Sequence, residues 1–561
     1  MPVYNEHSSA GVYAGVKDLS AGATSLSTAV VGMCGQARRG PVNQRVAITD
    51  EDDLKNIFGL KDPKYGLGLY VALPISQQTN QLYYVRLVKN AKYAVAVLTV
   101  DDPTAVKPVL RLNNLTDDDG NILGVNSPDE LGFLPGDILN ENTIGYIITE
   151  NPGDWNNNMA LQIRPAVPKG LDAFDDRTKY NTKLFYIDEF ENYVPGSVAV
   201  STHTCCLKDY KDDFNKQYRV GTVFEDESSN FRFIQNEYFT TDIDFLTTDF
   251  VFLKGGSDGD KVTSDDLSTA YQTYYSDPEE CRVTLLVSGG IEDYIIHRGM
   301  KLAADNHLNC HVIGCVPTDQ QTVAKAIRYR KQTLNLSARN MSLYTPDIKI
   351  FDTDTGRYLT VPCAGQIAAV YCYTDNNRGS WFAPAGIKAS EVLDILGLTQ
   401  KYDQDDRDAM TRELLNYVRK LPEQAGGGFA VWEANTLLAT TSAFQQIQIQ
   451  RMVGYVLEVC QKSCKVGLFD PNDDILRQYL KGIVEKFLEE IKLARGLRSG
   501  KSGSQGYVVV CDRTNNTNAT IANGDLVLDI VLDPTRTTKR LIYRFNINPK
   551  GSTSTVLGEA A

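Results

Sequence analysis

The sequence predicts a large multidomain protein of the α+β and α/β classes: a core of mixed sheet plus helices, with inserted α/β and β-rich outer domains. Three observations predict this fold class. Strand-like and helix-like runs alternate in residues 25–88 and 265–335, short β-like runs fill residues 89–244, and long helix-like runs dominate residues 389–497. At 561 residues, the chain is too long for one hydrophobic core.

Changes in pattern divide the chain into four expected parts. Residues 1–22 are polar around a short β-prone run and are expected to be an arm that joins the last domain. An α/β middle domain is expected from residues 23–88 and 245–362, interrupted by a β-rich inserted outer domain in residues 89–244. Residues 363–561 are expected to form the C-terminal core domain, with a terminal strand arm.

The first α/β stretch contains two predicted strands, at residues 28–32 and 81–88, and two predicted helices, at 50–58 and 66–77. In the β-rich part, short apolar runs are bounded by Pro, Gly and Asn, and each run predicts a strand. These runs are residues 94–100, 144–149, 159–163, 184–187 and 197–201.

The second α/β stretch has the order strand, helix, strand, helix, at residues 282–288, 291–307, 310–316 and 320–335. This order is typical of a parallel βαβ unit. The expected buried face of the first helix, read from its helical spacing, consists of Ile291, Ile295, Ile296 and Leu302.

The last domain is predicted to be mainly helical and then to end in strands. Its predicted helices are residues 389–396, 407–420, 441–461 and 473–497. Its predicted strands are residues 507–512, 525–532 and 540–547. The last of these strands is available to pair with another chain.

Short motifs of glycines, turn residues and aromatic residues occur along nearly the whole chain. They include Ala10-Gly11-Val12-Tyr13, Gly32-Met33-Cys34-Gly35-Gln36, Gly153-Asp154-Trp155-Asn156-Asn157, Leu253-Lys254-Gly255-Gly256-Ser257-Asp258-Gly259, Gly379-Ser380-Trp381-Phe382-Ala383-Pro384-Ala385-Gly386 and Phe469-Asp470-Pro471-Asn472. Each motif alone is weak, but their order resembles that of contractile tail sheath proteins, which occur in bacteriophages with myovirus tails and in related injection machines. One departure is Gln450-Arg451, where members of that family often carry paired arginines.

The resemblance implies a structural subunit, not an enzyme, with no catalytic residues, cofactors or metals. Such subunits form hexameric rings that stack into a helical sheath around a tail tube. The sheath is metastable when extended, and it contracts to drive the tube through the host cell envelope for genome ejection. The implied partners are further copies of the chain, the tail tube protein, and baseplate and tail terminator proteins. The implied location is the virion tail, after synthesis in the host cytoplasm.

The charge balance excludes some other classes of partner. The net charge is -13, from 57 basic and 70 acidic residues, which argues against a nucleic-acid coat because binding phosphates needs a basic face. No apolar run approaches the ~20 residues that cross a bilayer, so we expect no membrane insertion. The N-terminal residues also lack the pattern of a secretory signal.

Known catalytic and metal-binding patterns are missing from the sequence. Residues 254–261 have glycines near lysines, but not at the spacing of a phosphate-binding loop, and a turn is the better interpretation. The five histidines do not have the spacing of metal ligands. An enzyme alternative would use residues 283–290, where Ser288-Gly289-Gly290 forms a turn beyond a strand, but the sequence assembles no nucleophile, base and stabiliser there.

The eleven cysteines are scattered and form no Cys-x-x-Cys pair. We expect reduced and mostly buried thiols. The alternative is disulfides between subunits, with Cys205 and Cys206 as surface candidates because they follow polar residues.

Two β-prone runs, one near each end of the sequence, are predicted to be arms that pair with strands of neighbouring subunits. Strand addition of this kind supplies main-chain hydrogen bonds without large side-chain pockets. The residues concerned are Gly11, Val12, Tyr13, Val16, Leu541, Tyr543 and Phe545.

A basic run without an acidic residue consists of Lys492, Arg495, Arg498 and Lys501. One interpretation is local, because cations complement a helix C-terminus and Gly496 and Gly500 are typical stop signals. The resemblance implies another, since family members grip the tube with a helix in this part. The four side chains would then face an acidic band on the tube, with Arg498 one turn beyond Arg495 if the helix continues.

Two alternative functions remain from the sequence. A sheath of a bacterial contractile injection system, pyocin-like or toxin-delivering, has the same mechanics without a genome. The less favoured alternative is the α/β enzyme described above.

Overall fold

A computed structural model describes residues 26–102, 110–117, 119–131, 142–166, 184–207, 211, 214–227, 230–236, 248–387, 390–423, 427–498 and 505–539. They belong to two compact units. The larger unit consists of Leu26–Ser380 and Pro384–Glu458, and the smaller includes Trp381–Ala383 and the described residues from Val459 onward. Several predicted features lie outside the described residues: the strand at 540–547, Gly11, Val12, Tyr13, Val16, Lys501, Leu541, Tyr543 and Phe545.

An eight-stranded sheet is the largest element of the larger unit, with strand order β2-β3-β1-β13-β14-β15-β19-β20. The six strands from β3 to β19 run parallel, and β2 and β20 are antiparallel edges. β1, β14 and β15 are buried along their whole length, as expected for a parallel sheet covered on both faces. The bounds are β1 Val31–Gly35, β2 Arg45–Ile48, β3 Leu82–Arg86, β13 Leu285–Val287, β14 His311–Cys315, β15 Met341–Thr345, β19 Asn416–Lys420 and β20 Phe429–Trp432.

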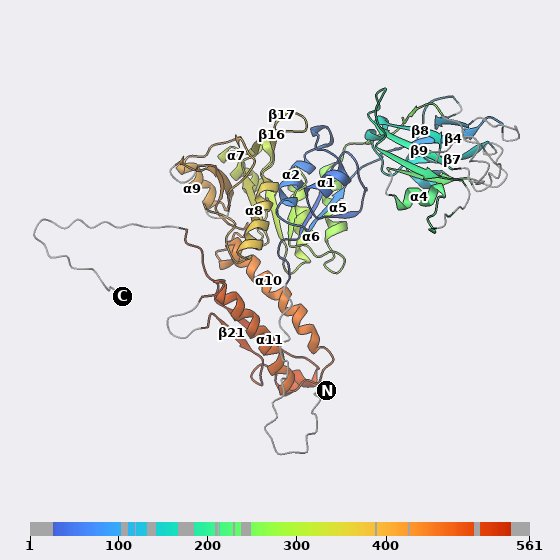
Figure 1. Ribbon diagram of the computed structural model, residues 1–561. Coiled ribbons are helices and arrows are strands. Elements are labelled where there is room, and N and C mark those ends of the chain that lie inside the picture. The colour runs from blue at the N-terminus through green and yellow to red at the C-terminus, as the bar shows by residue number, and fades with distance from the viewer. Residues whose placement is uncertain are drawn as a thin grey trace, which may run out of the picture. The chain divides into compact units, whose positions relative to one another are not determined.

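Helices pack on this sheet in pairs, α2 with α8 and α5 with α6 (Figure 1). The local sequence explains where they begin: the Asp50 carboxylate accepts the Asp53 N–H at 2.8 Å, and Thr263 and Asp266 form a capping box. The predicted βαβ unit is confirmed, because β13 and β14 are parallel neighbours in the sheet and α6 lies between them in the chain. The bounds are α1 Glu51–Phe58, α2 Gly68–Ser76, α5 Ser264–Tyr275, α6 Tyr294–Asp305, α7 Val323–Arg328, α8 Ala364–Asn377 and α9 Gln404–Arg412.

Three helix predictions need correction. The buried face of α6 includes Ile296, Met300 and Ala303, whereas Leu302 is 54% exposed. The predicted helix at 389–396 is wrong, since its described residues form a bridge to β20 and lead into β18 (Gly397–Leu398), which pairs with β16 (Ile348–Asp352) beside β17 (Arg357–Val361). The predicted helix at 407–420 ends at Arg412, and the chain continues as β19.

The β-rich insertion folds into two antiparallel sheets that share one apolar core (Figure 1). Their orders are β10-β9-β8-β12 and β11-β7-β4-β5, and β6 also pairs with β4. Four of the five predicted strands are confirmed, but the run at 197–201 is wrong because β10 only begins at Ser201. The bounds are β4 Tyr93–Val100, β5 Leu110–Asn114, β6 Gly124–Val125, β7 Thr143–Thr149, β8 Met159–Pro165, β9 Phe185–Glu191, β10 Ser201–Cys205, α4 Val220–Asp226, β11 Phe231–Gln235 and β12 Val251–Phe252.

Two of the motifs quoted above meet in the structure. The Asp154 N–H donates to the Asp258 carboxylate at 3.0 Å, and the side chain of Asn157 exchanges hydrogen bonds with Gly256 at 2.9 and 3.1 Å. The buried guanidinium of Arg86, at the end of β3, donates to the Pro152 carbonyl at 3.1 Å. These contacts therefore tie the segment that follows β12, and the end of β3, to the loop that precedes β8.

The smaller unit contains the last described elements of the chain. They are α11 Asp474–Leu493, β21 Tyr507–Val510, α12 Asn518–Ala522 and β22 Asp529–Leu532, and α10 (Ile447–Cys464) is divided between the units after Glu458. β21 and β22 confirm the predicted strands at 507–512 and 525–532, with narrower bounds.

The cysteines are buried, with one exception. Cys464 is partly exposed, and the other ten are buried. The proposed surface candidates are wrong, because Cys205 and Cys206 are 0% and 5% exposed. No helix in the described part of the chain is long and apolar enough to cross a bilayer.

Candidate assembly surfaces

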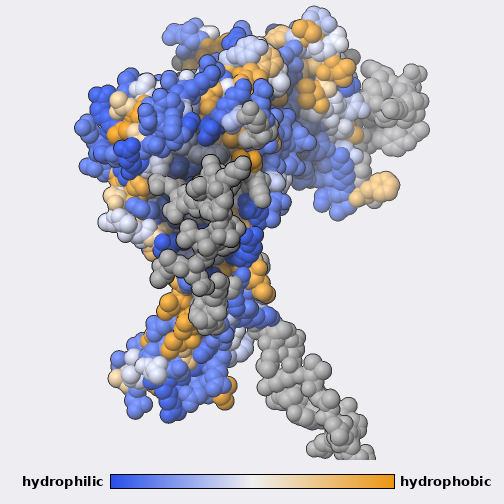
Figure 2. Space-filling view, turned by 90° about the vertical axis from the view of Figure 1, so that its left-hand side faces the viewer, coloured by the Kyte–Doolittle hydropathy of each residue, from blue (hydrophilic) through white to orange (hydrophobic). Residues whose placement is uncertain are grey.

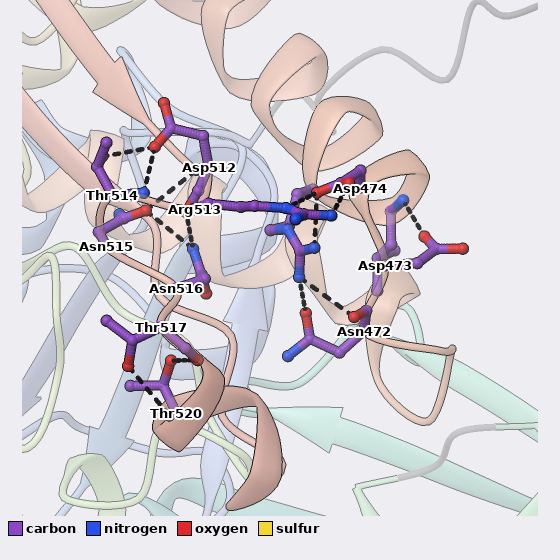
Figure 3. A network of polar contacts seen from close by, with 12 residues as sticks. Asn472, Asp473, Asp474, Asp512, Arg513, Thr514, Asn515, Asn516, Thr517 and Thr520 are labelled. Atoms are coloured by element: carbon purple, nitrogen blue, oxygen red, sulfur yellow. Dashed lines mark hydrogen bonds and ion pairs between the residues drawn. The ribbon is translucent and has the colours of Figure 1, made fainter.

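A polar network fixes the start of α11 against the connection between β21 and β22 (Figure 3). Asp473 is the N-cap, and its carboxylate accepts the Leu476 N–H at 2.8 Å. Asp474 forms ion pairs with Arg513 at 2.9 Å and with Arg477 at 2.8 Å. Hydrogen bonds from Arg513 and Arg477 lower the pKa of Asp474 to about 2, so this carboxylate is charged at neutral pH.

The connection itself is held by two asparagines. The buried Asn516 accepts the Val527 N–H at 2.7 Å and donates to the Val527 carbonyl at 2.8 Å, as a neighbouring strand would. Asn515 donates to the Val510 carbonyl at 2.8 Å. The two side chains therefore fix the spacing between the end of β21 and the start of β22.

β21 and β22 form an antiparallel pair with one covered and one open face. Tyr507 and Val509 are buried, and the Tyr507 hydroxyl hydrogen-bonds Glu489 of α11 at 3.1 Å. On the opposite face Val508 and Val531 stand directly across from each other and are 56% and 61% exposed. Within the described residues no third strand pairs with this sheet, so the outer edges of both strands carry open main-chain groups.

α11 ends four residues earlier than predicted. The Arg495 N–H donates to the Lys492 carbonyl and the Gly496 N–H to the Ile491 carbonyl, both at 2.9 Å, which is the pattern of a Schellman motif. Arg495 occupies the left-handed position with φ 69°, where glycine is usual. The Trp381 indole N–H donates to the Ala494 carbonyl at 3.0 Å and also closes the helix end.

The predicted basic run is therefore not a stripe along one helix. Lys492 is on the last turn of α11 and pairs with Glu489 at 3.0 Å. Arg498 lies beyond the helix, so the condition for its position one turn further on is not met, and it is 3.8 Å from Asp533. Arg495 is exposed and has no acidic side chain within ion-pair distance among the described residues.

Gln450 and Arg451, the departure noted in the sequence, are both buried in the larger unit. The Gln450 side chain hydrogen-bonds His311 at 3.0 Å, and burial lowers the pKa of His311 to about 3, so the imidazole is neutral. The Arg451 guanidinium pairs with the buried Asp375 carboxylate and donates to the Thr28 carbonyl at 3.2 Å. A second arginine at position 450 would bring another charge into this buried site.

The structure also tests the enzyme alternative at the end of β13. Ser288 donates to Glu292, Glu292 is 2.9 Å from His297, and His297 is 3.0 Å from the Tyr329 hydroxyl. Sequence reasoning missed this network, although its residues have the chemical types of a catalytic site. Ser288 and His297 are 0% exposed, so a substrate has no access to them without an opening of the fold.

Comparison with known proteins finds similarity in sequence and similarity in fold. No protein-family profile matches the chain. The tail sheath protein of Enterobacteria phage T4 is 23% identical over 385 residues, which cover 64% of this chain and 54% of that protein. The tail sheath protein of Vibrio phage KVP40 is 27% identical over 195 residues, which cover 35% of this chain and 28% of that protein.

The fold is similar to that of a solved sheath protein. The crystal structure of a sheath tail protein from Listeria innocua has a TM-score of 0.54 and 12% identity, covering 88% of this chain and 91% of that chain. The predicted resemblance to tail sheath proteins and the predicted fold class are therefore confirmed. The chain spans about half the length of the phage T4 protein, and less of the KVP40 protein.

Proposed function

We propose that this chain is the structural subunit of a contractile tail sheath. It polymerises around a tail tube in a metastable extended state and contracts to drive the tube through the host cell envelope. The observation that carries this proposal is the alignment of 385 residues with the phage T4 tail sheath protein. The proposed location is the virion tail, and the proposed partners are further copies of the chain, the tube, the baseplate and the tail terminator.

The free energy of contraction is stored in subunit packing, so the proposed mechanism needs no nucleotide or cofactor. The same surfaces offer two arrangements, one of lower free energy, separated by a barrier. An enzymatic role is disfavoured by the full burial of Ser288 and His297. The alternative function is a sheath of a bacterial contractile injection system. Its subunits have the same mechanics, but the machine carries no genome.

Strand addition is the proposed link between subunits. The arm around Gly11, Val12, Tyr13 and Val16 and the run containing Leu541, Tyr543 and Phe545 would pair with the open edges of β21 and β22 in neighbouring copies. Support comes from the exposed edges of this two-stranded sheet, because the unpaired main-chain groups of an edge strand can pair with another chain. Each added hydrogen bond contributes ~1 kcal/mol net, so a few per arm hold subunits together.

Deletion of residues 1–18 tests this link. We expect the shortened chain to remain a folded monomer by circular dichroism and sedimentation, because residues 1–18 are polar around one short β-prone run. It should form no sheath tubes under conditions in which the full chain does. Tubes of normal length and spacing from the deletion would rule out an essential N-terminal arm.

Attachment to the tube is proposed to use Lys492, Arg495, Arg498 and Lys501. The exposure of Arg495 without an acidic partner among the described residues supports this proposal most directly. An exposed ion pair contributes only ~0–1 kcal/mol, but repetition along the tail multiplies the contact. The summed attachment along the tail is strong, whereas the contact of each subunit is weak enough to break as contraction moves along the tail.

A further inference from the structure

The turn between α10 and α11 exposes an unusual group of apolar side chains. Phe469 is 105% exposed and has φ 67°, a left-handed conformation that is rare for a bulky residue. Val466, Leu468 and Ile475 are 55%, 65% and 77% exposed. We call these four residues the Phe469 tip. Exposed apolar groups gathered in one place, rather than scattered singly, mark interaction surfaces.

The larger unit offers an apolar pocket of matching character. A cavity of about 310 Å³ lies between α2, α8 and β16, and its lining includes Leu73, Val370 and Phe351. The side chains at its opening are half exposed: Phe351 is 47%, Tyr373 43%, Ile387 54% and Leu393 58% exposed. We call this cavity the α2–α8 pocket. On the face seen in Figure 2, hydrophobic residues reach the surface in separate patches on an otherwise hydrophilic molecule.

Charges beside the tip and the pocket are complementary. Lys465, one residue before the tip, is exposed, and Glu391 and Asp394 are exposed in the lining of the pocket. In the portion of the chain that is described, none of these three side chains forms an ion pair. Lys61 also lines the pocket, but it already pairs with Asp352 at 3.4 Å and with Asp354 at 3.7 Å. The tip therefore has a cation beside its apolar side chains, and the pocket has two anions beside its own.

We propose that the Phe469 tip of one copy inserts into the α2–α8 pocket of a second copy. The contact joins two different surfaces, so it is heterologous, and repetition of it produces a ring or an open helical polymer rather than a closed dimer. Phe469 is the anchor, Leu468 and Ile475 cover the rim, and Lys465 faces Glu391 and Asp394. This contact adds a side-chain link to strand addition and rests on the proposed function of the chain as a polymerising subunit.

Cysteine cross-linking tests the contact directly. One chain carries Phe469→Cys and a second carries Leu393→Cys, and the two are mixed, assembled and treated with a mild oxidant. We expect a disulfide-linked dimer on non-reducing gels from the mixture, and monomer from each variant alone. The parent chain controls for native thiols, of which ten are buried. Absence of the dimer from assembled mixed tubes overturns the proposal.

A second measurement uses assembly itself. Phe469→Ala should raise the critical concentration for tube formation about tenfold, because truncation of an aromatic anchor weakens binding strongly. Val198→Ala, which truncates another exposed apolar side chain (89% exposed), is the control and should assemble like the parent. Lys465→Glu should also weaken assembly, and Glu391→Lys with Asp394→Lys should restore it. Failure of this charge exchange to restore assembly counts against the contact.

The outcomes separate this contact from the proposed function. If the parent forms no tubes, the proposed function fails. If the parent forms tubes while the cross-link and the Phe469→Ala effect are both missing, the function stands and this contact is wrong. A cross-link found only within a chain carrying both cysteines places the tip in its own pocket and also overturns the proposal.

Discussion

The side chains of Arg451 and Asp375 form a buried ion pair, 2% and 0% exposed, in the larger unit. Arg451→Met leaves Asp375 buried without its counter-charge and should lower the free energy of unfolding by about 3–5 kcal/mol. Denaturant unfolding of the monomer measures this loss. The double variant Arg451→Met with Asp375→Leu removes both charges and should recover much of the stability. Equal destabilisation of the single and double variants would show that packing, not charge, explains the effect.

His203 is enclosed by two carboxylates in the β-rich insertion, at 2.7 Å from Glu227 and 3.0 Å from Glu189. Burial alone lowers the pKa of His203, but hydrogen bonds to Glu189 and Glu227 outweigh it and raise the pKa above its usual value. A raised pKa stabilises the fold below the unfolded value of about 6.5, and this contribution is lost as pH rises through the folded value. The difference in melting temperature between the parent and His203→Gln should therefore shrink from pH 6 to pH 9. A difference independent of pH would contradict this assignment.

The burial of a single residue could be predicted from the sequence where the residue type alone determines it. Most cysteines are buried because a free thiol behaves as a small apolar group. The network of Ser288, Glu292, His297 and Tyr329 could not be predicted, because its last member is 32 residues from His297 and joins it only through tertiary packing. Cys205 and Cys206 were misjudged for the same reason, since polar neighbours in sequence do not fix which face of a strand is covered.

The elements with local start signals were the most predictable. Asp50 and Asp473 are N-cap residues of a type that can be recognised from the sequence alone, and α1 and α11 begin directly after them. The end of α11 was missed because its left-handed residue is Arg495 and not glycine. The run at 407–420 was misread because a short apolar stretch suits a helix or a strand, and Leu414 with φ 62° separates α9 from β19.

The end of α11 distinguishes a structural role of Arg495 from a role in tube attachment. Arg495→Gly relieves the left-handed conformation and should stabilise the chain by about 1 kcal/mol. If the Arg495 charge holds the tube, this more stable variant should still assemble less well on tubes. The double variant Arg495→Glu, Arg498→Glu should fold normally, lose extended assembly on tubes, and still form tube-free polymers.

Two matched results would contradict tube attachment at this helix end. One is extended assembly of the double glutamate variant at the parent's level in a co-sedimentation assay with tubes. The other is equal binding of Arg495→Gly and the parent. In either case these cations serve only the helix end, and another surface holds the tube.

At the scale of the whole molecule, the order of strands in the eight-stranded sheet does not follow their order along the chain. β1 lies between β3 and β13, although Val31 and its partner Leu285 are separated by the entire insertion. The sheet also includes β19 and β20, which follow residue 363. The class, the βαβ unit and the β-rich insertion could be predicted because each depends on local periodicity, whereas the sheet order depends on long-range pairing. The four-part domain division stays a prediction.

Negative-stain electron microscopy of the purified 561-residue chain is the most direct test of the central proposal. A sheath subunit functions through repeated contacts between copies. Polymerisation is therefore the property that distinguishes it from an enzyme or a monomeric binding protein. The account predicts long tubes with regular striations, formed without nucleotide. Monodisperse single particles across a wide range of concentration and ionic strength would contradict it.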